Sequence, residues 1–164
     1  MRKLRENAGF SLVELMVVVG IIGVLTTLAI PNYTKFANKA KQSEAKSQLA
    51  AIYTVEKAYQ VEASTFTACL SDIGYVAEGS NRRYGVGFSG TITALTSPTG
   101  TNCTVSANKT YFLPASGVAV ADFPTTSAET GTFTAGAAGS IGGSQKDKWT
   151  IDQSQTLANP TSGI

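Results

Sequence analysis

Histidine is absent from this chain, and charged residues make up only 15% of its 164 positions. Histidine is the commonest general base in enzymes and a frequent metal ligand, so its absence removes the usual centre of hydrolytic and metal-dependent chemistry. The formal net charge is only +2, which provides no strongly basic surface for a nucleic acid. We therefore expect a structural protein and not an enzyme, with no cofactor, no metal and no specific affinity for nucleic acid.

A phosphate-binding loop is also missing. Glycine is abundant, with 16 residues, but the pattern G-x-x-x-x-G-K-[ST] does not occur. Residues 125–145 are rich in Gly, Ser, Thr and Ala and nearly uncharged. A segment of this composition buries little apolar area, so we expect an exposed loop there.

One long apolar segment is present at residues 10–30, which read FSLVELMVVVGIIGVLTTLAI. About 21 helical residues span roughly 30 Å, the thickness of the hydrocarbon core of a bilayer. The single acid in the run, Glu14, opposes insertion by around 3 kcal/mol, and by less near a helix end. The thirteen Leu, Ile, Val and Phe residues of the run favour insertion by roughly 4 to 8 kcal/mol in sum. The run is therefore predicted to cross a membrane.

Glu14 is predicted to have no partner within its own helix. The next charged residue downstream is Lys35, about 21 residues or 30 Å further along a helix. A lone carboxylate in a medium of low dielectric constant is costly. We therefore expect its partner to come from another molecule.

Two simpler interpretations of the apolar run stay open. In the first, Arg2, Lys3 and Arg5 begin a secretory signal peptide, although such peptides have apolar regions of only about 7 to 15 residues and end at a small-residue cleavage site. In the second, the run is a plain single-pass anchor. Neither interpretation explains the acid.

At the start of the run, Arg2 and Lys3 are followed by Gly9-Phe10-Ser11-Leu12-Val13-Glu14-Leu15, and then by Gly23 and Pro31. These residues closely resemble the N-terminal signature of type IV pilins and the related pseudopilins. The resemblance runs without a gap from about residue 2 to residue 31 and fades beyond Lys57.

The resemblance implies that residues 1–9 are a leader peptide. A membrane-embedded prepilin peptidase would cut between Gly9 and Phe10 and methylate the new amino group of Phe10. Glu14 would then meet the terminal amine of a neighbouring subunit. Residues 10–164 carry ten basic and ten acidic side chains, so the net positive charge belongs to the leader.

The helix of residues 10–31 is predicted to continue through residues 32–63. This second half is rich in Ala, Lys, Gln and Glu and contains no glycine or proline. Apolar residues at helical spacing predict one packed face, formed by Leu49, Ile52, Val55 or Glu56, and Tyr59.

Three residues are expected to soften the first half of the helix. Gly20 and Gly23 each weaken helix preference by about 1 kcal/mol, and Pro31 removes a backbone hydrogen bond. For an isolated subunit this predicts a simple kink. The resemblance to pilins implies a loss of helical order in the assembled filament.

Residues 64–164 are predicted to form a globular head. Apolar alternation indicates strands at 86–94, 103–113, 118–123 and 148–153, separated by Gly, Pro and Asn. One long helix packed on a C-terminal antiparallel sheet is an α+β fold. Near the end of the chain we expect Trp149 and Ile151 to point inward, and Asp147 and Asp152 to be surface acids rather than calcium ligands.

Cys69 and Cys103 are the only two cysteines. In a domain exported past an oxidising compartment, an even pair favours a disulfide, here closing a loop of roughly 35 residues and contributing about 3 to 4 kcal/mol in the chain-entropy model. Two buried free thiols are the alternative. Many pilins place their disulfide nearer the C-terminus, so this pair departs from the commonest pattern of the family.

Basic and aromatic side chains follow the apolar run. The lysines are expected to form a solvated or inter-subunit surface, and contact with lipid head groups stays open; they are Lys35, Lys39, Lys41 and Lys46. Packing between neighbouring helices explains the aromatic residues, and electron transfer along a filament is the weaker alternative; they are Phe10, Tyr33, Phe36, Tyr53 and Tyr59.

The resemblance implies a type IVa-like major pilin, the structural subunit of a pilus that supports adhesion, motility or DNA uptake. Its partners would be identical subunits in a helical homopolymer, the prepilin peptidase, the inner-membrane assembly machinery, and membrane lipid before assembly. The chain would reside in the inner (cytoplasmic) membrane as precursor and subunit pool, and in an extracellular pilus after assembly. The alternative is a pseudopilin of a type II secretion system, which shares the N-terminal signature.

Overall fold

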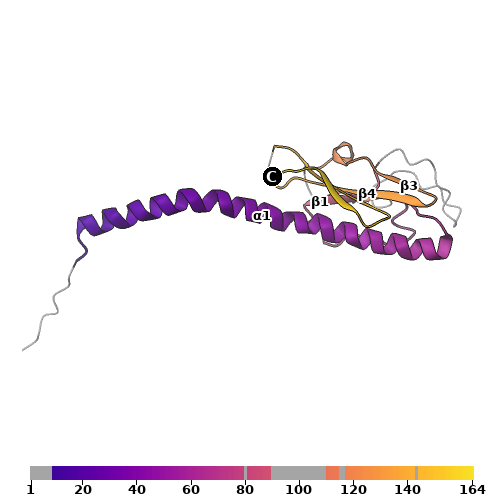
Figure 1. Ribbon diagram of the computed structural model, residues 1–164, viewed down its shortest axis with the longest axis horizontal. Helices are drawn as coiled ribbons and strands as arrows, with labels where there is room; N and C mark the ends of the chain where they lie inside the picture. The colour runs from indigo at the N-terminus through magenta and orange to yellow at the C-terminus, as the bar shows by residue number, and fades with distance from the viewer. Residues whose placement is uncertain (1–8, 80, 90–109, 115–116, 143) are drawn as a thin grey trace, which may run out of the picture. The chain divides into compact units, whose positions relative to one another are not determined.

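The computed structural model describes residues 9–79, 81–89, 110–114, 117–142 and 144–164. The chain divides into two compact units, Met1–Ala37 and Asn38–Ile164. One long helix, α1 (Leu12–Ala63), contributes residues to both (Figure 1). α1 is continuous through Gly20, Gly23 and Pro31, and the softening of this stretch stays a prediction.

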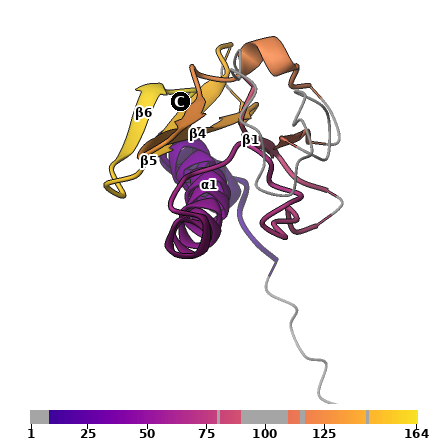
Figure 2. The ribbon, with the colours of Figure 1, turned by 90° about the vertical axis from the view of Figure 1, so that its right-hand side faces the viewer.

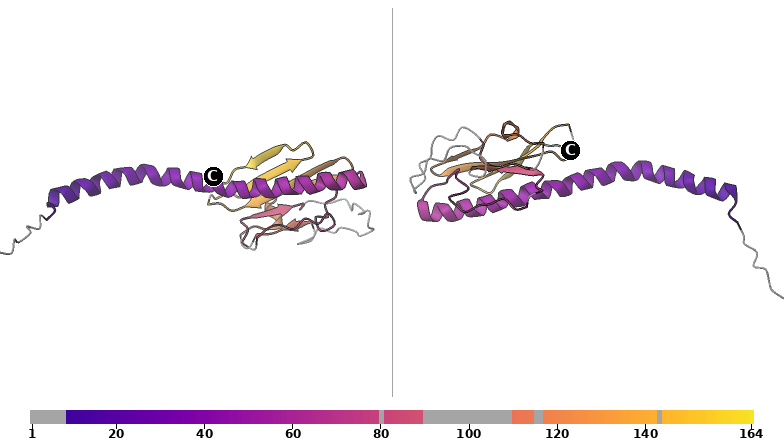
Figure 3. Two further views of the ribbon diagram at one scale, coloured as in Figure 1. Left: turned by 90° about the horizontal axis from the view of Figure 1, so that it is seen from below. Right: turned by 180° about the vertical axis from the view of Figure 1, so that it is seen from behind.

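The second unit contains an antiparallel sheet in the order β2-β1-β4-β5-β6, with β3 also paired to β4. β3 pairs with the first residues of β4 and β1 with the last ones. In Figures 2 and 3 the part of α1 that belongs to this unit lies along one face of the sheet. The predicted α+β fold is confirmed. Its elements are β1 (Tyr84–Gly87), β2 (Tyr111–Phe112), a 3-10 helix η1 (Val120–Asp122), β3 (Ser127–Glu129), β4 (Thr132–Gly139), β5 (Asp147–Asp152) and β6 (Leu157–Thr161).

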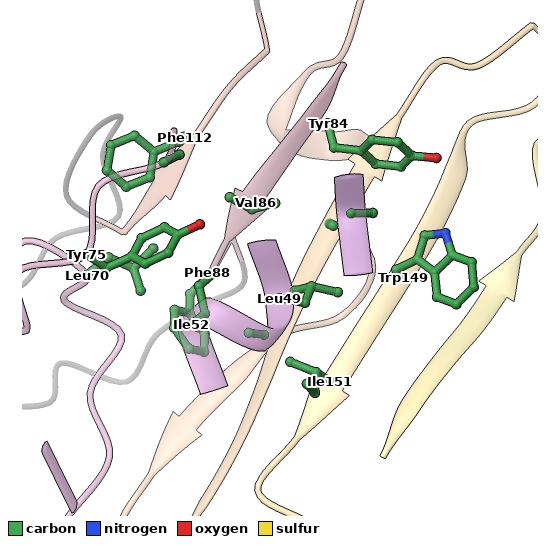
Figure 4. Close-up of a cluster of buried hydrophobic side chains, with 14 of the residues drawn as sticks. Leu49, Ile52, Leu70, Tyr75, Tyr84, Val86, Phe88, Phe112, Trp149 and Ile151 are labelled. Carbon is green, nitrogen blue, oxygen red and sulfur yellow. The ribbon is translucent and has the colours of Figure 1, made fainter. Parts of the chain in front are cut away.

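The core lies between α1 and the sheet (Figure 4). Leu49 and Ile52 of α1 are fully buried, as the helical spacing predicts. Phe133 of β4 is the aromatic centre, because its ring centroid lies 4.8 Å from that of Phe66 and 6.4 Å from that of Phe88. Trp149 and Ile151 of β5, also buried, point inward as expected.

The prediction of an exposed loop at residues 125–145 is wrong. Most of β4 is buried, and it pairs with β1, β3 and β5. Small residues are required there, since a Cβ at Gly139 would lie 2.5 Å from the ring of Tyr84, and one at Gly136 would lie 2.7 Å from Pro124. The composition that indicated a loop is the composition that lets bulky neighbours pack against this strand.

Other strand predictions have mixed outcomes. The strand predicted at 118–123 is wrong, because η1 forms there; the N–H of Ala119 donates to the carboxylate of Asp122 at 2.8 Å and so favours a turn. Residues 90–94 and 103–109 lie outside the described part of the chain. β6 was not predicted because its sequence, LANPT, contains a proline and lacks clear alternation.

The prediction that Asp147 is a surface acid is wrong. Asp147 is fully buried at the start of β5. Its two carboxylate oxygens accept hydrogen bonds from five neutral donors, so it is not available to a cation. The donors are Gln42 Nε2 (3.0 Å), Tyr84 OH (2.5 Å), Trp149 Nε1 (2.6 Å), Asn159 Nδ2 (3.1 Å) and the N–H of Gly163 (2.9 Å).

These bonds connect α1, β1, β5, β6 and the end of the chain at one carboxylate. Burial by itself would raise the pKa of Asp147, but the hydrogen bonds stabilise the anion and hold the pKa below its ordinary value. Burial and the adjacent anion also raise the pKa of Tyr84, which therefore donates as a neutral phenol. Figure 4 shows the Tyr84 hydroxyl and the Trp149 indole nitrogen on the same side of the core.

Glu56 is a second buried acid, and it has a different environment. It is fully buried on the sheet-facing side of α1, and the N–H of Thr67 donates to its Oε2 at 3.2 Å. Its Oε1 has no hydrogen-bond partner among the described residues. Burial raises the pKa of Glu56 to about 8, and the Thr67 bond lowers it only in part. The carboxyl group is therefore protonated at neutral pH.

Glu56→Gln is expected to stabilise the head at neutral and alkaline pH. A carboxyl whose folded pKa is raised contributes its full stability below the unfolded pKa and loses it as pH rises toward the folded pKa. In the wild-type chain the free energy of unfolding therefore falls by roughly 2 to 4 kcal/mol between pH 4.5 and pH 7 through Glu56 alone. Glutamine is neutral throughout, so the variant should lack this slope. Urea unfolding of the full chain in detergent at pH 5, 7 and 8.5 measures it, and equal pH slopes in both chains would contradict the assignment.

Candidate processing and assembly site

The first unit exposes nearly all of its apolar side chains. Between Leu12 and Ile30 the large apolar residues are 50 to 73% exposed. By length and composition, α1 is the one described helix that is able to cross a membrane, and none of its most apolar window is buried. Such a surface is stable only in contact with lipid or with other apolar chains.

Ser11 and Glu14 form a capping box at the start of α1. The backbone N–H of Glu14 donates to Ser11 Oγ at 3.2 Å, and the N–H of Ser11 donates to Glu14 Oε2 at 3.1 Å. Two N–H groups that the helix leaves unpaired are thereby satisfied, and an acid is favourable at this end of a helix. The carboxylate is held in one orientation at the first turn.

This geometry corrects the expectation that Glu14 has no partner within its own helix. The partner is a neutral N–H group, so the negative charge itself stays uncompensated by a cation. The S-x-x-E pattern before an apolar run is a recognisable signal for a capping box. An expectation based only on the charge of Glu14 in lipid does not include this cap.

The polar side chains further along the apolar half are satisfied by their own helix. Thr26 Oγ1 donates to the carbonyl of Ile22 at 2.7 Å, and Thr27 Oγ1 donates to that of Val24 at 2.7 Å. Hydroxyl groups bonded in this way are compatible with hydrocarbon. Glu14 is therefore the one feature of this half that opposes a lipid environment.

The remaining predicted site residues lie as follows. Gly9 and Phe10 precede α1, both are exposed, and Phe10 is 91% exposed. Gly9 lies five residues and Phe10 four residues before Glu14, just ahead of the N-terminal end of α1. Cys69 is buried in the second unit, whereas Cys103 lies outside the described residues, so the disulfide between them stays a prediction.

Comparisons with known proteins show which families this chain is similar to. Residues 4–30 match the model of the prokaryotic N-terminal methylation motif. The type IV major pilin protein PilA of Myxococcus xanthus (strain DK1622) is 47% identical over 77 residues, which are 47% of this chain and 35% of that protein. The chain is type IV pilin-like, with an N-terminal methylation motif.

Other relatives of this pilin-like chain belong to two kinds of protein. A fimbrial protein of Pseudomonas aeruginosa is 29% identical over 85 residues, covering 52% of this chain and 51% of that protein. The type II secretion system core protein G of Vibrio cholerae serotype O1 is 35% identical over 66 residues, covering 40% of this chain and 45% of that protein. The pilin-like chain thus spans about half or less of the length of these relatives.

Proposed function

We propose that this chain is the structural subunit of a type IV pilus, polymerised through the apolar half of α1. The observation that supports this most is the capped Glu14 carboxylate at the head of an exposed apolar helix, within a matched methylation motif. The role is structural and not enzymatic. The chemistry is done on the chain by a prepilin peptidase that cuts between Gly9 and Phe10 and methylates Phe10.

Cleavage creates the cation that the site lacks. Removal of residues 1–9 leaves a protonated amine on Phe10, and methylation keeps its positive charge. When a second subunit places this amine beside Glu14, the two charges attract more strongly as water and its high dielectric constant are excluded. Pairing between copies therefore favours the polymer over the single subunit in the membrane, and it fixes the register of one helix against the next.

A pilus subunit of this kind has different partners and a different location before and after assembly. Before assembly the apolar half of α1 lies in the inner (cytoplasmic) membrane, in contact with lipid and the inner-membrane assembly machinery. After assembly it is covered by identical subunits in a helical homopolymer outside the cell. The fibre would serve adhesion, motility or DNA uptake.

A pseudopilin of a type II secretion system is the second candidate. The similarity to core protein G of Vibrio cholerae supports it, and the capping box and apolar helix suit both roles. Electron microscopy of cells that express the chain distinguishes the two. Long external fibres that disappear on deletion support the pilus, whereas secretion loss without fibres supports the pseudopilin.

Processing is tested by the mass of the mature chain isolated from membranes or fibres. We expect the chain to begin at Phe10 and to carry one methyl group on its amino terminus. Gly9→Val in the same cells is the control, because a branched side chain before the cleaved bond should leave the leader attached. A mature chain that begins elsewhere would refute the proposed processing.

A further inference from the structure

Two aromatic side chains stand exposed just beyond the apolar run. Tyr33 is 75% exposed and Phe36 is 69% exposed. They lie three residues apart in α1, which places them on neighbouring positions of one helix face. Lys35, also exposed, lies between them in the sequence. All three belong to the first unit, and no described residue of that unit covers them.

Their position along the helix matches a membrane surface. From Ser11 to Tyr33 the helix extends about 33 Å at 1.5 Å per residue, slightly more than a hydrocarbon core of roughly 30 Å. If the capping box lies at one surface, then Tyr33 and Phe36 lie at the other. Tyrosine is enriched at this depth because its ring prefers the acyl boundary while its hydroxyl reaches water.

Two polar side chains next to Tyr33 are bonded to carbonyl groups of their own helix. Asn32 Nδ2 donates to the carbonyl of Leu28 at 3.2 Å, and Thr34 Oγ1 donates to that of Pro31 at 3.0 Å. These bonds let the segment approach the acyl boundary without losing hydrogen bonds to water.

The charges that follow the apolar run favour anionic lipid head groups. After Glu14 the next acid in the sequence is Glu44, so the stretch that follows the apolar run contains lysines and no acid. The amine of Lys41 is already bonded to the carbonyl of Ile141 and to Asn38 Oδ1, each at 2.9 Å. Lys35, in contrast, is exposed, and a lysine stem extends its amine toward lipid phosphates.

We infer that Tyr33, Lys35 and Phe36 form an interfacial band that binds phospholipid head groups, with a preference for anionic ones, in the unassembled subunit. The band fixes the depth of the apolar helix, and so the height at which Glu14 and the Phe10 amine are presented. This inference rests on the membrane-inserted subunit of the proposed function and adds a lipid partner to it.

Depth is measured with the full chain in vesicles of phosphatidylcholine and phosphatidylglycerol. A nitroxide on a ketone-bearing residue is introduced singly at Leu25, Asn32 or Ser47, which leaves the cysteines and the band untouched. Collision rates with oxygen and with a water-soluble nickel chelate give the depth. We expect Leu25 in hydrocarbon, Asn32 at head-group level and Ser47 in water, and we expect Tyr33→Ala with Phe36→Ala to move Asn32 away from that level.

Lipid preference is measured by native mass spectrometry of the chain released from mixed micelles. Retained phosphatidylglycerol should exceed phosphatidylcholine, and Lys35→Gln should reduce the ratio by about fivefold. Lys46→Gln is the control, because Lys46 belongs to the part of the same helix within the head and its amine lies 4.7 Å from the centroid of the Trp149 ring, so its loss should leave the ratio unchanged.

The outcomes separate the band from the larger proposal. An Asn32 label as accessible to the chelate as Ser47, with Leu25 in hydrocarbon, would overturn the band and leave the inserted subunit standing. The band would also be overturned if Tyr33→Ala with Phe36→Ala left the depth of Asn32 unchanged, or if Lys35→Gln left the lipid ratio unchanged. A Leu25 label in water would show that the chain does not insert, and would refute the proposed function itself.

Discussion

Glu14→Gln and Glu14→Ala are expected to reduce the yield of assembled filaments by at least about tenfold, a change that requires only 1.4 kcal/mol of lost subunit pairing. Both variants remove the anion that the Phe10 amine of another copy would neutralise. They also remove the one group that makes the single subunit unfavourable in lipid, so the balance shifts toward the membrane pool. Filaments sheared from cells are quantified against the total chain in membranes.

Ser11→Ala separates the charge of Glu14 from its capping role. It removes the Oγ that accepts from the Glu14 N–H but keeps the carboxylate, and loss of such a cap costs typically about 1 kcal/mol of helix stability. We expect this variant to keep most of its filaments. If Ser11→Ala loses as many filaments as Glu14→Gln, then assembly depends on the structure of the first helical turn and not on the charge of Glu14. Normal filament yield from Glu14→Gln would contradict the proposed pairing outright.

Asp147→Ala is expected to lower the free energy of unfolding of the head by roughly 3 to 5 kcal/mol. The substitution leaves the donors of Gln42, Tyr84, Trp149 and Asn159 without an acceptor inside the protein. It also removes the hydrogen bond that Gln42 of α1 makes to the start of β5 and the one that the N–H of Gly163 makes after β6. Urea unfolding of the full chain in detergent measures the effect, and the fluorescence of Trp149 reports the cluster itself.

Two variants control this experiment. Asp72→Ala removes an exposed acid of the same type and should change stability by less than about 0.5 kcal/mol. Asp147→Asn keeps the shape but points an amide donor at other donors, so it should also destabilise. Because the folded pKa of Asp147 is lowered, its contribution is present above the unfolded pKa and is lost as pH falls through the folded value. An Asp147→Ala chain as stable as the wild type would show that the cluster is dispensable.

The N-terminal half of this protein could be predicted because its signals are local. The apolar length, the position of Glu14 and the helix-forming residues up to Ala63 each depend on residues a few positions apart. The capping box is equally local, because the three-residue spacing of Ser11 and Glu14 is enough to predict it.

The head was harder to predict because its decisive contacts are distant in sequence. The donors to Asp147 come from positions 42, 84, 149, 159 and 163, and no short window contains them. β4 is made of residues typical of a loop, and it becomes a central strand because Tyr84 and Pro124 need space beside Gly139 and Gly136. Burial of Glu56 is an exception, because helical spacing already places Val55 or Glu56 on the packed face of α1 with Leu49 and Ile52.

Neutralisation of the Glu14 anion by the amine of another copy is the central step of the proposed assembly. A structure of the assembled polymer, at a resolution that resolves side chains, tests this directly. We predict the amino-terminal nitrogen of Phe10 from one subunit within about 4 Å of the Glu14 carboxylate of its neighbour, the range of an ion pair. A polymer in which Glu14 contacts only its own Ser11, with every Phe10 amine elsewhere, would contradict it.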